Sequence, residues 1–179
     1  MRALLAALAF LPFPALAFED AATGFAFRAP PGAVEAPSDR TRFDAAVAID
    51  AAPGGPPPAG TSRHLCEAGY KAARNNAHLT QRQINALAAR RDRMERVKKS
   101  LGVGFEVTAI RAVGLGDVLG AEIEARPKFG PGHEDARAYL TIHETPKGRV
   151  TLVCVTTAQA WEKALPLFRD IRSGLILPR

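Results

Sequence analysis

Four histidines, and the carboxylates beside two of them, are the side chains best suited to acid–base or metal chemistry. His133 stands in the segment GHED with Glu134 and Asp135, and His143 is followed by Glu144. Such a cluster could hold a divalent cation weakly, but no two histidines have the i, i+4 spacing of a helical zinc site. We therefore expect no metal, and solvated loop positions for these residues. The alternative is that His133 or His143 acts with carboxylates in an exported hydrolase or lyase.

Other catalytic patterns in the sequence are weaker. Glu122 and Glu124 alternate along one predicted strand, which fits either a solvated sheet surface or a polar contact covered by a helix. None of the serines stands in a G-x-S-x-G nucleophile motif. The segment GLGDVLG, residues 114–120, has the glycines of a phosphate-binding loop, but strand-like residues follow it where a helix N-terminus is needed. The sequence predicts a hairpin turn there, and no cofactor.

The only two cysteines, Cys66 and Cys154, are predicted to form one disulfide. An even number of cysteines in an exported chain is typical of a disulfide, because the oxidising compartment lets the bond persist. Closing a loop of about ninety residues contributes on the order of 4 kcal/mol. Two buried free thiols are the alternative. A metal site is less favoured, because His64 is the only Cys or His at ligand spacing from either cysteine.

Positive charge is concentrated in one segment. The whole chain has a formal net charge of +6, and the residues from Thr80 to Leu101 include seven basic and two acidic ones, so the rest is close to neutral. Clustered Arg and Lys can bind nucleic acid, but export would separate the chain from it, and no aromatic stacking platform accompanies the segment. The residues predicted to contact an anionic partner are Arg82, Arg90, Arg93, Arg96, Lys98 and Lys99.

The basic segment is predicted to be one amphipathic helix. Thr80 and Gln83 form a capping box at its start, and Gly102 and Gly104 end it. The basic side chains should face away from the core, apart from Arg91, whose stem is expected to lie along the seam. The apolar positions, at three- and four-residue spacings, are Ile84, Leu87, Met94, Val97 and Leu101.

Ahead of this helix the sequence predicts two strands and another helix. Residues 25–29 and 42–50 are typical of a pair of strands, and the Pro/Gly-rich residues 51–60 of a surface connector. Residues 63–76 are predicted to be helical, so that residues 61–104 would be a helical insertion between the second and third strands. The core-facing side of this first helix would carry Cys66, Tyr70 and Ala73.

After Gly104 the apolar residues recur at every second position, as they do in β-strands. Four strand-like segments, within residues 105–157, are joined by turns too short for parallel connections, so they should be antiparallel. A terminal helix follows, capped by Thr156 or Thr157 and kinked or interrupted at Pro166. Its apolar side would carry Trp161, Leu165, Phe168 and Ile171. The fold class is therefore α+β: an antiparallel sheet of about six strands with helices packed on one or both faces, in a single domain over residues 18–179.

The first seventeen residues have the pattern of a secretory signal peptide. Arg2 precedes an apolar run, and Ala15 and Ala17 form a small-residue cleavage site that would release a chain starting at Phe18. The run is too short to span a membrane, which takes about 20 residues, and no later segment is apolar enough. An uncleaved amphipathic anchor is the alternative. We expect a periplasmic or secreted protein.

The two ends of the mature chain share a pattern with a known family. An opening strand runs into the turn at residues 30–32, and the terminal helix carries Phe168 and Ile171 before Ser173, Gly174 and Leu175. In these features the chain resembles PsbP-like domains. The resemblance implies an α-β-α sandwich and an accessory or assembly role without catalysis. It transfers no functional residue to this chain.

Together these observations predict an exported, non-catalytic accessory protein whose basic helix binds an anionic partner. An acidic protein is favoured over anionic lipid, because the large apolar residues of the helix are needed by the core. The alternative is that the basic face is simply solvated and keeps the protein soluble, because runs of charged residues are usually solvated faces.

Overall fold

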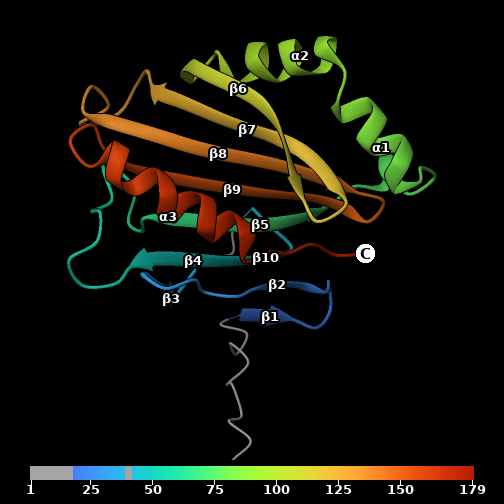
Figure 1. The fold of residues 1–179 in the computed structure, drawn as a ribbon, viewed down its shortest axis with the longest axis horizontal. Coiled ribbons are helices and arrows are strands. Elements are labelled where there is room, and N and C mark those ends of the chain that lie inside the picture. Colours follow the sequence, from blue (N-terminus) through green and yellow to red (C-terminus); the bar gives the residue numbers. More distant parts are fainter. Residues whose placement is uncertain (1–17, 39–41) are drawn as a thin grey trace, which may run out of the picture.

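A seven-stranded antiparallel sheet dominates the computed structural model, which describes residues 18–38 and 42–179 (Figure 1). The predicted signal peptide, residues 1–17, lies outside the described residues. In spatial order the strands are β3 (Ala33–Ala36), β4 (Ala45–Ala51), β5 (Cys66–Ala72), β9 (Gly148–Thr157), β8 (Ala136–Thr145), β7 (Val118–Pro127) and β6 (Phe105–Leu115).

A smaller sheet brings the N-terminal strands together with the C-terminal segment. It consists of β1 (Phe18–Asp20), β2 (Phe25–Phe27) and β10 (Leu175–Ile176), with β2 in the middle. The predicted pairing of residues 25–29 with 42–50 is therefore wrong, since β4 pairs with β3 and β5 instead. The phenylalanines of β2 are fully buried in one cluster with Phe168 and Ile171 near the C-terminus, a long-range contact that overrides the local strand pattern.

Helices cover both faces of the seven-stranded sheet (Figure 1). Adjacent residues of a strand point to opposite faces, and on β8 Tyr139 packs in one apolar cluster while Leu140 packs in the other. The first cluster includes the buried side of α3 (Trp161–Ser173). The second receives Met94, Val97 and Leu101 of α2 (Arg91–Leu101). The α+β class and the sandwich of helix, sheet and helix are confirmed.

The helix predicted at residues 63–76 is wrong, because the segment forms strand β5. Cys66, Ala68 and Tyr70 are buried and alternate with Glu67 and Gly69, as in a strand with one face on the core. Pairing on both sides, with β4 and β9, stabilises this conformation. Gly69 lets Phe43 lie flat on the strand, since a Cβ there would come within 2.3 Å of the Phe43 ring. Only the short 3₁₀ helix Arg74–Asn76 remains of the prediction.

The basic segment folds as two helices, α1 (Gln81–Ala88) and α2, rather than one. The capping box is confirmed: Thr80 accepts a hydrogen bond from the Gln83 backbone, and the Gln83 side chain accepts one from the Thr80 backbone. Arg90 interrupts the helix with an extended backbone, ψ 134°. The two helices have different anchors. The Asn85 side chain donates a hydrogen bond to the Asp117 carbonyl and accepts one from the Leu119 backbone, so α1 is held at the start of β7, while α2 lies over β6.

The four strands after Gly104 form the predicted antiparallel meander, β6 to β9, and residues 114–120 contain the predicted hairpin turn between β6 and β7. The terminal helix α3 also buries the predicted apolar side. Its N-cap is Ala160 rather than a threonine, although Thr157 accepts a hydrogen bond from the Ala160 backbone. Pro166 lies inside α3 without a restart, and the helix runs on to Ser173.

A disulfide joins Cys66 of β5 to Cys154 of β9, as predicted. The two cysteines lie directly opposite each other in the β5–β9 register and in the cluster beneath α3. The alternative of two free thiols is therefore wrong. Among the described residues, no helix is long and apolar enough to cross a membrane.

Candidate functional site

The solvent side of α2 carries a strong excess of positive charge. We call the exposed cations of α2 and of its N-cap residue Arg90 the basic surface; they are Arg90, Arg91, Arg96, Lys98 and Lys99. Two exposed acidic residues, Asp92 and Glu95, lie among them. The apolar side chains of α2 are used against the sheet, so this helix offers charge rather than apolar area to solvent. Arg82, the remaining exposed candidate, lies on α1.

Two of these cations are partly neutralised by Asp92. Arg90 and Arg96 approach its carboxylate at 2.9 and 3.0 Å. The hydrogen bond from Arg90 is the main reason why the pKa of Asp92 is lowered. These pairs are exposed and strongly screened by solvent. Within the described parts of the chain, Arg91, Lys98 and Lys99 make no side-chain hydrogen bond or ion pair, and Glu95 is the acidic residue one helical turn from each of them. They carry most of the net positive charge of α2.

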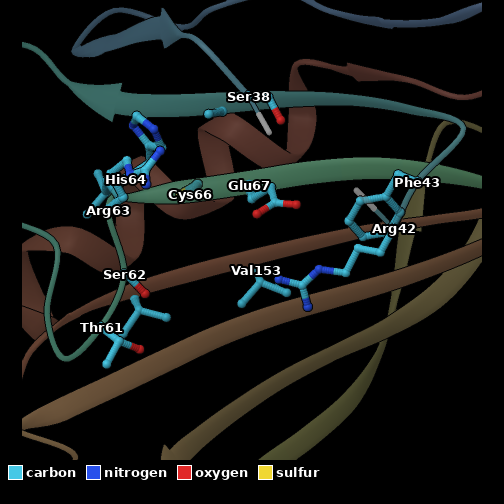
Figure 2. Close-up of a pocket in the computed structure, with 13 residues that line it drawn as sticks. Ser38, Arg42, Phe43, Thr61, Ser62, Arg63, His64, Cys66, Glu67 and Val153 are labelled. Carbon is cyan, nitrogen blue, oxygen red and sulfur yellow. The ribbon is translucent and has the colours of Figure 1, made fainter. Parts of the chain in front are cut away.

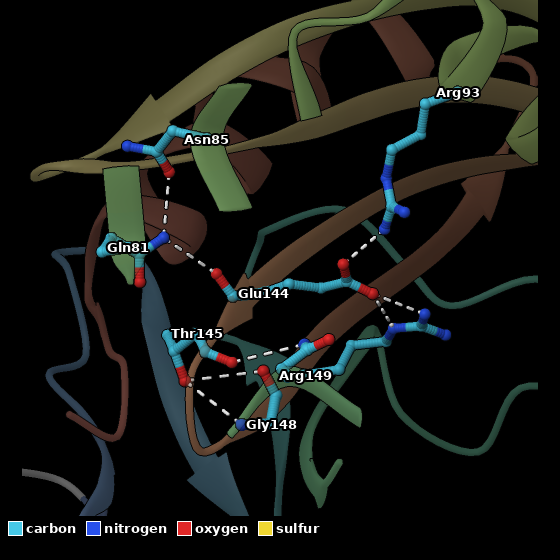
Figure 3. A network of polar contacts seen from close by, with 8 residues as sticks. Gln81, Asn85, Arg93, Glu144, Thr145, Gly148 and Arg149 are labelled. Carbon is cyan, nitrogen blue, oxygen red and sulfur yellow. Dashed lines mark hydrogen bonds and ion pairs between the residues drawn. The ribbon is translucent and has the colours of Figure 1, made fainter. Parts of the chain in front are cut away.

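Arg93 and Arg91 have exchanged the positions expected from the sequence. Arg93 turns toward the sheet and forms an ion pair with Glu144 of β8, which also pairs with Arg149 of β9 (Figure 3). Arg91, which was expected to lie along the seam, is exposed. Because the helix is interrupted at Arg90, the side of α2 that faces the sheet differs from the side that a single continuous helix would predict. Arg93 therefore holds α2 on the sheet and does not belong to the basic surface.

The same network fixes α1. The side-chain amide of Gln81 donates hydrogen bonds to the Glu144 backbone carbonyl, at 3.1 Å, and to the Asn85 side chain, at 2.9 Å (Figure 3). Glu144 thus contacts both helices, α1 through its backbone and α2 through its carboxylate. The basic surface is consequently presented from a helix pair that is anchored to β8, rather than from a loop.

The two histidines considered for catalysis lie apart, because one precedes β8 and the other is near its end. His133 is exposed, with Nδ1 at 2.9 Å from the Gly130 carbonyl oxygen and 3.1 Å from Glu134. The prediction of a solvated loop position is confirmed for His133 and wrong for His143, which is fully buried. Among the described residues, no group of three or more His, Cys, Asp or Glu side chains could hold a metal ion.

His143 is a core residue with an unusual environment. Neither ring nitrogen has a hydrogen-bond partner, and Gly120 on β7 makes room for the ring, since a Cβ there would come within 2.6 Å of it. Burial, followed by repulsion from Arg172, lowers the pKa of His143 to about 4, against the attraction of Glu122. The histidine is therefore neutral in the folded protein at neutral pH.

This depressed pKa makes stability pH-dependent. The ordinary histidine pKa is about 6.5, so as the pH falls the unfolded chain takes up the proton before the folded protein does. The free energy of unfolding is therefore highest above about pH 6.5 and decreases as the pH falls toward 4, by up to about 3 kcal/mol. We expect His143→Leu to flatten this part of the profile, measured by urea unfolding between pH 7 and 4.5. His133→Leu is the control and should keep the wild-type slope. Equal slopes for all three proteins would contradict the assignment.

Glu122 lies beneath α3 at the centre of a charged cluster. Its side chain is 1% exposed and pairs with Arg111 of β6 and Arg172 of α3, and Tyr139 donates a hydrogen bond to it at 2.8 Å. Burial opposes its ionisation, but the hydrogen bonds from Tyr139 and Arg111 and the charge of Arg172 outweigh it and lower the pKa of Glu122. Of the two possibilities for this strand face, the helix-covered contact is correct for Glu122. It ties α3 to the sheet.

A groove of about 450 Å³ lies over β4, β5 and β9 (Figure 2). Ala48, Glu67 and Val153 are neighbours across these strands and line it. At one end His64 also lines it, with Nδ1 at 2.9 Å from the carboxylate of Asp50, which accepts a further hydrogen bond from the Leu65 backbone.

The pairing of His64 with Asp50 was missed by sequence reasoning, because fourteen residues separate the two. The β4–β5 pairing, which sets Ile49 opposite Cys66, brings them together. A carboxylate-anchored imidazole can serve as a base. Within residues 18–38 and 42–179, however, no hydroxyl or thiol is hydrogen-bonded to the His64 ring. The described residues of the groove therefore show no nucleophile–base contact of the kind that marks a hydrolytic site.

The fold can now be compared with solved structures. The solution structure of cyanobacterial PsbP (CyanoP) from Synechocystis sp. PCC 6803 superposes with a TM-score of 0.50, over 97% of this chain and 98% of that one, at 12% sequence identity. The chain has a PsbP-like fold. The similarity in fold therefore covers nearly the whole chain and not only its two ends. No family model matches the sequence, and no curated protein matches it either.

Proposed function

We propose that this chain is an exported accessory protein that binds an anionic protein partner through the basic surface of α2 and catalyses no reaction. The observation that carries the proposal is the set of Arg91, Lys98 and Lys99, which are exposed and have no acidic partner among the described residues, on a helix anchored to the sheet by Arg93. Fixed, uncompensated charge is what speeds association with an oppositely charged surface.

Three further observations support the proposal. The disulfide fits an oxidising compartment outside the cytoplasm, and such a location disfavours nucleic acid as the partner. Met94, Val97 and Leu101 pack on the sheet, so α2 has no apolar face to lay on a bilayer. The hydrolase or lyase alternative would place His133 or His143 with carboxylates in a cleft at the sheet edge, and it is less favoured because His143 is fully buried and His133 is exposed on a loop.

A crosslinking pull-down from the native exported fraction tests the proposal. The bait variant Arg91→Gln/Lys98→Gln/Lys99→Gln should recover about tenfold less of the partner than the wild type at low salt, because its association is slower. The control Arg74→Gln/Lys147→Gln/Lys163→Gln loses the same charge from exposed positions outside α2 and should recover the partner as the wild type does. Equal recovery by all three baits, or equal loss in both variants, would refute a specific role for α2.

A further inference from the structure

Two large apolar side chains stand out from the surface at the end of α2. Val103 is 79% exposed and Phe129 is 72% exposed, whereas the other exposed large hydrophobic side chains of the described chain, Val34 and Leu87, reach 44% and 39%. Folding places most side chains of this kind inside, and an exposed apolar patch commonly marks an interaction site. We call Val103 and Phe129 the apolar tip.

The apolar tip is held in place by backbone contacts, although both residues lie in loops. Phe105 and Pro127 are the first pair of the β6–β7 ladder, and the Lys128 backbone donates a hydrogen bond to the Gly104 carbonyl at 2.9 Å. Val103 and Phe129 are the chain neighbours of the two residues that this bond joins. The Lys128 ammonium also donates to the Gly102 carbonyl, at 2.5 Å. The two backbone segments that carry the apolar side chains are thus joined to each other, which lowers the cost of ordering them on binding.

The basic surface adjoins the apolar tip. A shallow groove of about 440 Å³ lies between the last turns of α2 and the start of β6. Lys98, Lys99 and Lys128 line it, together with Glu95 and Glu106, and Phe105 and Val107 of β6 provide its apolar wall. One end of α2 therefore combines exposed apolar area with a rim of mixed charge in which lysines predominate.

We infer that the apolar tip is the anchor of the docking surface, and that the partner is an acidic protein surface with an apolar pocket that receives Phe129. This inference rests on the proposed function and specifies its partner. An apolar centre within a charged rim is the usual anatomy of a protein interface. A polyanionic glycan offers no apolar pocket. An anionic bilayer would repel Glu95 and Glu106, whereas a protein can match the two signs of charge point by point.

A photoreactive amino acid at position 129 tests whether the tip touches the partner. It should crosslink a protein of the exported fraction, and the same amino acid at position 34, on the opposite edge strand β3, should not. Recovery supports the inference only if the recovered protein, produced in pure form, binds the wild type directly. Absence of a crosslink specific to position 129 would overturn the inference.

The dissociation constant for that purified protein then separates the two proposals. Val103→Ser/Phe129→Ser should raise it by about thirtyfold, as loss of an interface anchor does, without altering its dependence on salt. The control Val34→Ser/Leu87→Ser should bind as the wild type does. Thermal unfolding should show all of these surface variants folded, because none of the replaced side chains is buried.

Each result has a distinct meaning. If the tip variant binds the partner as the wild type does while the α2 charge variant binds it more weakly, the anchoring role of the apolar tip is refuted and the proposed function stands. If both bind normally, both proposals are wrong. Heparin and vesicles of mixed zwitterionic and anionic phospholipid serve as further probes. If the tip variant weakens binding to either of them and leaves the purified protein unaffected, the partner class inferred here is wrong.

Discussion

Glu122→Ala is expected to lower the free energy of unfolding by about 3–5 kcal/mol, the usual effect of removing one member of a buried ion pair. The side chain is 1% exposed, and its loss would leave the Tyr139 hydroxyl and the Arg172 guanidinium, itself 15% exposed, without their carboxylate. Arg111 is half exposed and can turn to water. Urea unfolding at pH 7 measures this change. The midpoint temperature of thermal unfolding, Tm, should fall by roughly 10 °C for a chain of this size.

Glu124→Ala is the matched control. This glutamate is on the same strand and pairs with Arg111 and Arg169 only at 3.7 and 3.8 Å, so the expected loss is below about 1 kcal/mol. The lowered pKa of Glu122 adds a second test. Its stabilising contribution is present above the ordinary carboxyl pKa and disappears as the pH falls through the lower folded value. Glu122→Gln should remove that acid-side dependence. If Glu122→Ala and Glu124→Ala lowered the free energy of unfolding by similar amounts, the stabilising role of the charged cluster around Glu122 would be contradicted.

Removing the disulfide has the other large expected effect. Cys66 and Cys154 are 88 residues apart in sequence, and freeing a loop of that length costs about 4–5 kcal/mol in the chain-entropy model. Both cysteines are buried between β5 and β9 beneath α3. Cys66→Ala/Cys154→Ala should therefore be less stable than the oxidised wild type by about this amount in urea unfolding at neutral pH.

Two measurements check the origin of that loss. A reducing agent should destabilise the wild type and leave the double variant unchanged. The purified, unreduced wild type should show no titratable thiol even in denaturant. Two titratable thiols, or a double variant as stable as the oxidised protein, would show that the bond is absent or contributes nothing.

Local signals in the sequence predict much of this fold. Thr80 and Gln83 mark a helix start within four residues of each other, and the capping box forms as expected. The period of two after Gly104, together with short turns, is enough for the β6–β9 meander. The disulfide is predicted from the even number of cysteines together with an oxidising compartment. Each of these depends on neighbours in sequence or on composition.

Strand β5 shows where such signals fail. Cys66, Tyr70 and Ala73 fit helical spacing, while Cys66, Ala68 and Tyr70 fit strand spacing equally well. Pairing with β9, about eighty residues later, decides between them. The pairing of β2 with the C-terminal β10 is equally distant in sequence. These strands belong to the core by virtue of long-range contacts that no local pattern contains.

The candidate site was predictable in composition but not in detail. The concentration of charge in residues 80–101 is visible directly, and α2 does present it to solvent. Which arginine faces the sheet depends on the break at Arg90, so that Arg93 meets Glu144 and Arg91 stays exposed. Val103 and Phe129 lie in the segments just beyond the β6–β7 ladder, and both are exposed. Hydropathy alone would place both in the core.

The association rate constant with the purified partner, measured across a range of ionic strength, tests the role of α2 most directly. For the wild type it should fall steeply as salt is added, because screening removes the long-range attraction. For Arg91→Gln/Lys98→Gln/Lys99→Gln it should be low at every salt concentration and join the wild-type curve at high salt. If the two curves coincide throughout, the cations of α2 do not guide binding.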